Sequence, residues 1–309
     1  MLPSSERYRP DVDGLRAVAV LLVVAYHAFP DAIRGGFIGV DIFFVISGFL
    51  ITAIIARDLE GARFSLATFY ARRIRRIFPA LIVVLCAVMI LGWLWMLPLA
   101  YAQLSSDVFF SAAFSANIAL MLQSGYFDVE SAKRPLLHLW SLGIEEQFYL
   151  AWPLILMLAA RLRLSLLWVA GAIGFASFAL NVALIRTSPI VTFYLPFTRA
   201  WELLAGGALA CSFDHISHDE RASNWRFGLG AALALSGHSL THTAFFPLVG
   251  AFAGCRQRAG VVGASGVGKP TAIDRPHRGL VGLISYPLYL WHCPLLVFFS
   301  IVKFKVTRS

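Results

Sequence analysis

The feature that most limits what this chain can fold into is the length of its uncharged apolar runs. Residues 17–30 and 77–103 contain no Asp, Glu, Lys or Arg. A helix needs about 20 apolar residues to cross the hydrocarbon core of a bilayer. Only 14% of the 309 residues are charged, whereas soluble domains contain about 25%. The sequence therefore predicts a polytopic membrane protein and excludes a soluble enzyme, a disordered chain and a fibrous protein.

The apolar segments predict an all-α fold, a membrane bundle of about nine or ten transmembrane helices. They fall at residues 15–33, 36–56, 77–99, 104–122, 139–160, 164–186, 197–213, 226–237, 240–253 and 279–302. The segments at 226–237 and 240–253 are too short to span alone, so they form either a helix pair or one broken helix. We expect residues 1–309 to form a single membrane domain with no soluble domain at the C-terminal end.

The net charge of +9 does not indicate nucleic-acid binding, because the basic residues lie between apolar segments. The densest cluster is Arg72, Arg73, Arg75 and Arg76. Clusters of this kind mark cytoplasmic loops, and they favour anionic lipid headgroups or anionic substrates. Together with the arginines before the first segment, this cluster predicts a cytoplasmic N-terminus. The sequence alone leaves membrane anchoring and ligand binding equally open for these arginines.

Neither the cysteines nor the one phosphate-loop look-alike indicates a cofactor. Cys86, Cys211, Cys255 and Cys293 are scattered singly, which predicts no zinc site, no other metal site and no disulfide framework. Residues 263–270 read GASGVGKP within the atypical polar stretch 254–278. A P-loop requires Ser or Thr where Pro270 stands, so we interpret the match as accidental.

Two charged or titratable residues in the first apolar segment are functional candidates. Arg16 and His27 differ by only about 20° around a helix and about 16 Å along it. One helix face therefore presents a cation near the cytoplasmic edge and an imidazole deeper in the membrane. Ionisable groups in a membrane are costly and mark functional sites by default. The alternative for His27 is a structural hydrogen bond between helices.

Residues 137–150, which read LHLWSLGIEEQFYL, hold the second concentration of polar groups. On a helix, His138, Ser141 and Glu145 share one stripe, while Glu146 points about 100° away. A buried carboxylate must be paired or protonated, and both states suit acid–base chemistry or hydroxyl binding. The residue types also allow a serine nucleophile, although side chains projecting in parallel from one helix rarely converge. A purely structural pairing with arginines elsewhere stays open.

Smaller signals lie further along the chain. Arg199 and Glu202 have the spacing of an ion pair within one helix. Tyr286, Tyr289 and His292 near the last segment either line a polar cavity or form an aromatic belt at the membrane interface. The small residues between 39 and 48 permit close approach of neighbouring helices.

Taken together, these segments resemble the acyltransferase-3 family of integral membrane acyltransferases. Arg16 and His27 match its R-x10-H signature, and Arg73 and Arg76 match its RxxR element. The other matching stretches are residues 8–20, 39–52, 69–79, 137–150, 198–204 and 284–292. The resemblance covers about 7–213 and 279–300. It departs at 254–278, where such proteins carry another apolar helix.

The resemblance implies transfer of an acyl group, expected to be acetyl, from acyl-CoA to a hydroxyl of a cell-surface carbohydrate or lipid-linked glycan. It implies His27 as the base, with a transient acyl-histidine as the less favoured alternative. Arg16, Glu145 and Glu146 would orient the reacting groups, and Arg73 and Arg76 would hold the donor phosphates. The expected cavity or acceptor residues are His138, Trp140, Ser141, Tyr286, Tyr289 and His292.

These implications fix the expected partners and location. Acyl-CoA (acetyl-CoA) is a co-substrate with no permanently bound cofactor, and the other partners are the glycan acceptor and the lipid bilayer. The location is the bacterial inner membrane, and the sequence indicates no oligomeric state. Two alternatives stay open: a proton-coupled transporter, which also places His, Glu and Arg within a membrane, and an inactive truncated family member.

Overall fold

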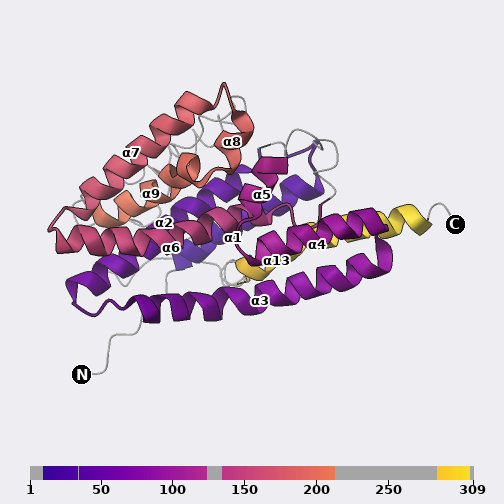
Figure 1. The fold of residues 1–309 in the computed structure, drawn as a ribbon, viewed down its shortest axis with the longest axis horizontal. Coiled ribbons are helices and arrows are strands. Elements are labelled where there is room, and N and C mark those ends of the chain that lie inside the picture. The colour runs from indigo at the N-terminus through magenta and orange to yellow at the C-terminus, as the bar shows by residue number, and fades with distance from the viewer. Residues whose placement is uncertain (1–9, 34, 124–133, 213–283, 307–309) are drawn as a thin grey trace, which may run out of the picture. The chain divides into compact units, whose positions relative to one another are not determined.

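The computed structural model describes residues 10–33, 35–123, 134–212 and 284–306 (Figure 1). Every regular element in those ranges is a helix, which confirms the predicted all-α class for that part of the chain. The helices are α1 (Pro10–Ala28), α2 (Ile38–Glu60), α3 (Leu66–Trp95), α4 (Pro98–Ala112), α5 (Ala116–Gln123), α6 (Leu139–Arg161), α7 (Leu166–Leu184), α8 (Pro189–Tyr194), α9 (Pro196–Ser212) and α13 (Ser285–Val306).

Five of the described helices are long and apolar enough to cross a membrane. These are α2, α3, α6, α7 and residues 285–303 of α13. The count of nine or ten spans stays a prediction, because the segments at 226–237 and 240–253 lie outside the described residues. The polar stretch 254–278 and its P-loop look-alike lie outside them as well.

The contacts divide the chain into two compact units. One comprises residues 1–46 and 213–286, and its described part contains α1 and the beginning of α2. The other comprises residues 47–212 and 287–309 and contains the rest of α2, α3 to α9 and most of α13.

Helix α3 begins earlier than the apolar run predicted, so the arginine cluster lies on its first turns rather than in a loop. Ser65 caps the helix, because its hydroxyl accepts the Thr68 N–H at 3.4 Å. Such a cap satisfies an N–H group that has no partner within the helix. Arginine is also a good helix former, so the helix continues through Arg73 and Arg76. The arginines are therefore carried at a fixed spacing along one rigid element.

The predicted segment 104–122 is two helices rather than one. Helix α4 ends at Ala112, and Phe114 adopts a left-handed conformation with φ of 51°. A side chain in that region is sterically disfavoured, so tertiary contacts must hold it. The carbonyl oxygen of Phe114 accepts a hydrogen bond from Gln147 Nε2 at 2.7 Å. Helix α6 thereby satisfies a backbone group that the helix break leaves without a helical partner.

A buried core fixes α6 in the larger unit. Trp152 is fully buried and donates its indole N–H to Thr52 Oγ1 at 2.8 Å. The same core contains Ile51, Ile55, Phe69, Tyr149, Leu156, Ala170 and Leu204. Helix α9 approaches α2 so closely that a Cβ on Gly48 would overlap the Leu203 carbonyl oxygen. This confirms the close helix approach that the small residues indicated.

The smaller unit shows the same kind of packing between α1 and α2. A Cβ on Gly39 would overlap the carbonyl oxygen of Ala19. A Cβ on Gly36 would likewise overlap the carbonyl oxygen of Leu22. Glycine is required at both positions because the two backbones lie in contact. The helix that carries Arg16 and His27 is therefore held at backbone level.

Candidate active site

Arg16 and His27 both lie on the continuous helix α1, so the predicted spacing on one helix face holds. The Arg16 guanidinium lies 3.9 Å from the Asp13 carboxylate, one turn earlier. Asp13 is buried, and pairing with a cation lowers the cost of burying its charge. The His27 ring is half-buried and meets the edge of Tyr26, with the ring centroids 5.1 Å apart.

The hydrogen bond of His27 fixes which nitrogen carries the proton. Nδ1 lies 2.9 Å from the carbonyl oxygen of Val23. A carbonyl oxygen only accepts, so Nδ1 carries the hydrogen in this bond. In the neutral imidazole, Nε2 then holds the lone pair. His27 is thus prepared to accept a proton at Nε2.

In the larger unit, Glu145 is held from two helices. Its carboxylate accepts hydrogen bonds from the Ser47 hydroxyl of α2 and from the Tyr149 hydroxyl of α6. The guanidinium of Arg73 lies over the Tyr149 ring, 4.8 Å from its centroid. Cation–π contact of this kind is attractive, and more so away from water. Arg73, Tyr149 and Glu145 therefore form one connected group between α3 and α6.

Glu146 faces a different neighbourhood, as the 100° rotation between successive helical residues predicted. Its charged neighbours are Arg73 and Arg76, which attract its carboxylate, and Glu145, which repels it. Its Oε1 atom is buried without a hydrogen bond among the described residues. Glu146 is thus the carboxylate that balances part of the charge of the arginine cluster.

The predicted cavity residues His138, Ser141, Tyr289 and His292 lie together between α6 and α13. The hydroxyl oxygens of Ser141 and Tyr289 are 2.6 Å apart, and the Tyr289 hydroxyl donates to the backbone oxygen of His138 at 2.8 Å. The His138 ring packs edge-on against Tyr289 and His292, with centroid distances of 5.2 and 4.9 Å. All four side chains are buried. The four residues therefore form one buried polar cluster, and whether they line a cavity stays a prediction.

Trp140 and Tyr286, also expected at the acceptor site, have other surroundings. The Trp140 ring packs against Phe193 and Tyr194 of α8, and the Arg199 guanidinium lies 5.7 Å from its centroid. Arg199 also forms the ion pair with Glu202 that the spacing predicted, at 3.1 Å. Tyr286 is half-buried on the first turn of α13, in the smaller unit.

Comparison with known proteins supports the interpretation that these motifs suggested. Residues 9–306 match a family model described as an acyltransferase domain. The chain belongs to the acyltransferase-3 family. It is 34% identical to the peptidoglycan O-acetyltransferase OatA of Listeria monocytogenes over 94% of this chain and 50% of that protein.

Other relatives carry similar names. The O-acetyltransferase OatA of Staphylococcus aureus is 31% identical over 95% of this chain and 51% of its own length. The putative peptidoglycan O-acetyltransferase YrhL of Bacillus subtilis is 34% identical over 94% and 49%. The chain thus spans about half the length of the curated relatives it matches. No solved structure matches it. Apolar helices and bacterial relatives together identify a multi-pass bacterial membrane protein.

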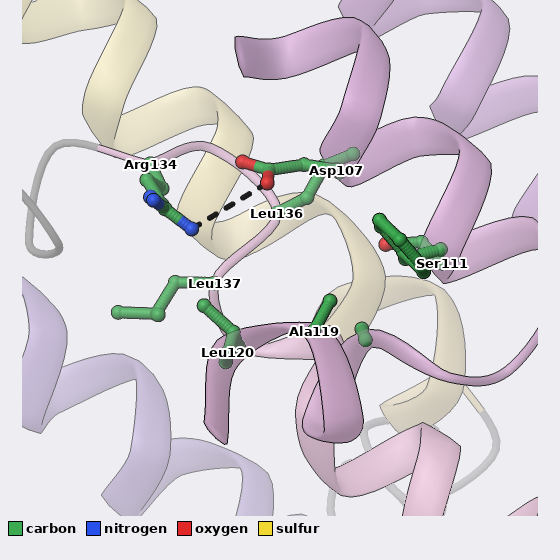
Figure 2. Close-up of a pocket in the computed structure, with 9 residues that line it drawn as sticks. Asp107, Ser111, Ala119, Leu120, Arg134, Leu136 and Leu137 are labelled. Carbon is green, nitrogen blue, oxygen red and sulfur yellow. Dashed lines mark ion pairs between the residues drawn. The ribbon is translucent and has the colours of Figure 1, made fainter. Parts of the chain in front are cut away.

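This acyltransferase-3 chain also contains a polar cluster that the sequence reasoning missed. Asp107 of α4 lies 3.5 Å from the guanidinium of Arg134, which precedes α6 (Figure 2). Gln103 donates to Asp107 at 3.0 Å, and Arg134 donates to Gln123 of α5 at 2.8 Å. One signal could have revealed it, because Asp107 is the only charged residue in the apolar segment 104–122.

Proposed function

We propose that this protein is a membrane O-acyltransferase that moves an acetyl group from acyl-CoA to a hydroxyl of a cell-surface glycan. Its membership of the acyltransferase-3 family and its peptidoglycan O-acetyltransferase relatives support the reaction class and the glycan acceptor. The observation that carries the proposal within the structure is the group formed by Arg73, Tyr149 and Glu145. In this group a guanidinium and a hydrogen-bonded carboxylate contact the same tyrosine.

Arg73 and Arg76 would hold the phosphates of the donor. Both lie on the first turns of α3, the end that the positive-inside rule assigns to the cytoplasm, where acyl-CoA is available. Guanidinium groups form charge-assisted and often bidentate hydrogen bonds with phosphate. Arg76 is exposed and Arg73 is half-buried. The pair therefore offers one exposed guanidinium and, about one turn earlier on the same helix, one that is partly buried.

His27 would act as general base on the acceptor hydroxyl. Its Nε2 lone pair takes the hydroxyl proton as the oxygen attacks the thioester carbonyl. The new carbon–oxygen bond forms as the carbon–sulfur bond breaks, and the departing thiolate takes up the proton. The products are the O-acetylated glycan and coenzyme A as a thiol. No oxidant, reductant or metal is required.

Glu145 and Glu146 would serve different parts of this reaction. Glu145 is fixed by the hydroxyls of Ser47 and Tyr149, so its negative charge stays at one position beside the arginine-bearing helix. Such fixed charges stabilise a transition state without reorganisation during the reaction. Glu146 faces Arg73 and Arg76, and its negative charge weakens their attraction for other anions. We assign Glu145 to the chemical step and Glu146 to donor affinity.

The cluster of His138, Ser141, Tyr289 and His292 would line the acceptor cavity. It combines hydroxyl and imidazole groups with aromatic faces, without a carboxylate or a guanidinium of its own. Neutral hydrogen-bonding groups beside aromatic rings suit uncharged sugar hydroxyls. Because the Ser141 hydroxyl contacts Tyr289 and the backbone of His138, we assign Ser141 to positioning rather than to nucleophilic attack.

The test combines cells with purified protein. Mass spectrometry of cell-surface glycans with and without the gene should show a shift of one acetyl unit. The full chain in proteoliposomes should transfer labelled acetyl from acetyl-CoA to a glycan acceptor. Uptake of a solute into those vesicles without any acetylated product would instead indicate a transporter. Absence of both activities would favour the inactive family member.

A further inference from the structure

The turn between α6 and α7 carries exposed basic and apolar side chains in alternation. Residues 161–164 read RLRL. Arg161 and Arg163 are exposed, and Leu162 and Leu164 are 59% and 52% exposed. Trp168, on the first turn of α7, is 79% exposed. We name these five residues the basic turn, and none of them is assigned to the donor or to the acceptor.

Backbone hydrogen bonds fix the conformation of the basic turn. The Arg163 N–H donates to the carbonyl oxygen of Ala160 at 3.1 Å, and the Leu164 N–H donates to that of Ala159 at 2.9 Å. These two bonds form the Schellman motif, which ends many helices and places one residue in the left-handed region. That residue is Arg163, with φ of 54°. Glycine adopts this conformation with less strain, so the backbone geometry does not explain why an arginine stands there.

Packing within the larger unit places the basic turn at the same end of the core as the start of α3. Leu156 of α6 and Phe69 of α3 belong to one buried core. Phe64, which precedes α3, and Leu166, which begins α7, both pack against that core. The positive-inside rule assigns the start of α3 to the cytoplasm. The basic turn therefore lies at the cytoplasmic face of the membrane as well.

The exposed apolar side chains indicate which kind of anion suits this surface. A soluble anion would neutralise the arginines but would leave Leu162, Leu164 and Trp168 in water, which is unfavourable for apolar surface. Tryptophan is favoured at the level of the lipid headgroups. The cytoplasmic leaflet also contains anionic lipids, which attract basic side chains beside the membrane. A phospholipid meets both requirements, because its phosphate faces the arginines while its acyl chains cover the apolar side chains.

We propose that the basic turn is a docking surface for anionic phospholipids of the cytoplasmic leaflet. Arg161 and Arg163 bind the headgroup phosphates through charge-assisted hydrogen bonds, and Leu162 and Leu164 contact the acyl chains. A zwitterionic headgroup carries an ammonium group that opposes the arginines, so the surface selects lipids with net negative charge. The inference does not depend on the proposed acyl transfer.

The test detects lipids at the basic turn through the fluorescence of Trp168. The full chain is placed in phosphatidylcholine bilayers with a small fraction of brominated phosphatidylglycerol or brominated phosphatidylcholine, since bromine quenches an adjacent indole. The quenching that disappears in Trp168→Phe belongs to Trp168. This quenching should give a binding constant for phosphatidylglycerol about fivefold or more above that for phosphatidylcholine, because one arginine at a membrane surface contributes about fivefold.

Variants of the two arginines and a matched control identify the source of this preference. Arg161→Gln with Arg163→Gln should bring the ratio of the two binding constants close to one, whereas lysine at both positions should keep most of it. Arg163→Gly removes one charge and relieves the left-handed backbone, so it should lower the ratio in a chain that folds at least as well. Arg186→Gln is the control, because Arg186 is an exposed arginine at the other end of α7, and it should leave the ratio unchanged.

Three results would overturn the inference. The first is equal quenching of Trp168 by the two brominated lipids in the wild-type chain. The second is a preference for phosphatidylglycerol that the double glutamine variant keeps in full. The third concerns the source of the phosphate: if inorganic phosphate abolishes the preference and chloride at the same ionic strength does not, the arginines bind a soluble anion rather than a lipid.

Discussion

The larger unit contains two groups of buried or half-buried opposite charges that differ in balance. Asp107 and Arg134 form a one-to-one pair enclosed by glutamine side chains. At the start of α3, the four arginines at 72, 73, 75 and 76 outnumber the nearby carboxylates of Asp58, Glu145 and Glu146. A balanced pair favours a neutral ligand, whereas an excess of cations favours an anion. The difference supports the proposed donor site at the arginine cluster rather than at the pair of Asp107 and Arg134.

The largest effect is expected for the chemical step, in which both proposed substrates react. His27→Ala should lower acetyl transfer by about 100-fold or more, because a positioned base contributes at least that much. Membrane abundance and the affinity for both substrates should stay near normal. The measurement is labelled acetyl transfer beside immunoblotting of the membrane fraction. Transfer at the wild-type rate would identify His27 as a structural residue.

The cation-rich end can be tested by removing its charge. Arg73→Gln with Arg76→Gln should raise the KM for the donor about tenfold or more, since charge-assisted contacts contribute about 1.5–3 kcal/mol each. The KM for the acceptor should not change. Arg72→Gln is the matched control, because Arg72 reaches Asp58 instead, at 3.8 Å, and is exposed. An unchanged donor KM in the double variant would limit the cluster to setting membrane topology.

Two variants compare the roles of the neighbouring carboxylates Glu145 and Glu146 beside the arginine cluster. Glu145→Gln keeps the shape but removes the charge held by Ser47 and Tyr149, and should lower kcat about tenfold or more. Glu146→Gln should have a smaller effect and should lower the donor KM, because Arg73 and Arg76 lose a competing anion. Steady-state kinetics with varied acetyl-CoA separates the two. The reverse order of kcat values would show that the Glu146 face lines the reacting groups.

The smallest effect is expected for the P-loop look-alike. Lys269→Ala should leave acetyl transfer unchanged, because Pro270 stands where a P-loop needs a hydroxyl for magnesium. The wild-type chain should neither bind nor hydrolyse ATP, as measured with a fluorescent nucleotide and by phosphate release. ATP affinity that disappears in the variant would contradict the accidental match.

Local patterns predicted what depends on neighbouring residues. The segment 139–160 forms α6 at Leu139–Arg161, because a mostly apolar stretch of about 20 residues favours a membrane helix. The rotation between successive helical residues also predicted that Glu145 and Glu146 face different neighbours. Ser47, the hydroxyl that holds Glu145, comes from another helix 98 residues earlier in the chain. No local pattern relates residues so far apart.

The break at Phe114 could not be predicted for the same reason. Residues 104–122 are mostly apolar, contain one charged residue, Asp107, and contain neither Gly nor Pro. The left-handed conformation at Phe114 depends on Gln147, which comes from α6. Because Phe114 lies within an apolar run, the residues next to it in the sequence do not indicate the helix break. Asp107 was visible as a lone charge, but its partner Arg134 follows the segment and became apparent only from the fold.

The same break bears on how the protein enters the membrane. Helix α4 has 15 residues and α5 has 8, so each is shorter than the stretch of about 20 residues that inserts as an independent span. Asn117 of α5 donates to Gln147 at 3.4 Å, and Gln147 returns a hydrogen bond to Asn117 at 3.0 Å. These amides lose their water only once α6 has been synthesised. We therefore expect the translocon to retain residues 98–123 until α6 emerges, so that this part of the chain integrates as a hairpin-like group rather than helix by helix.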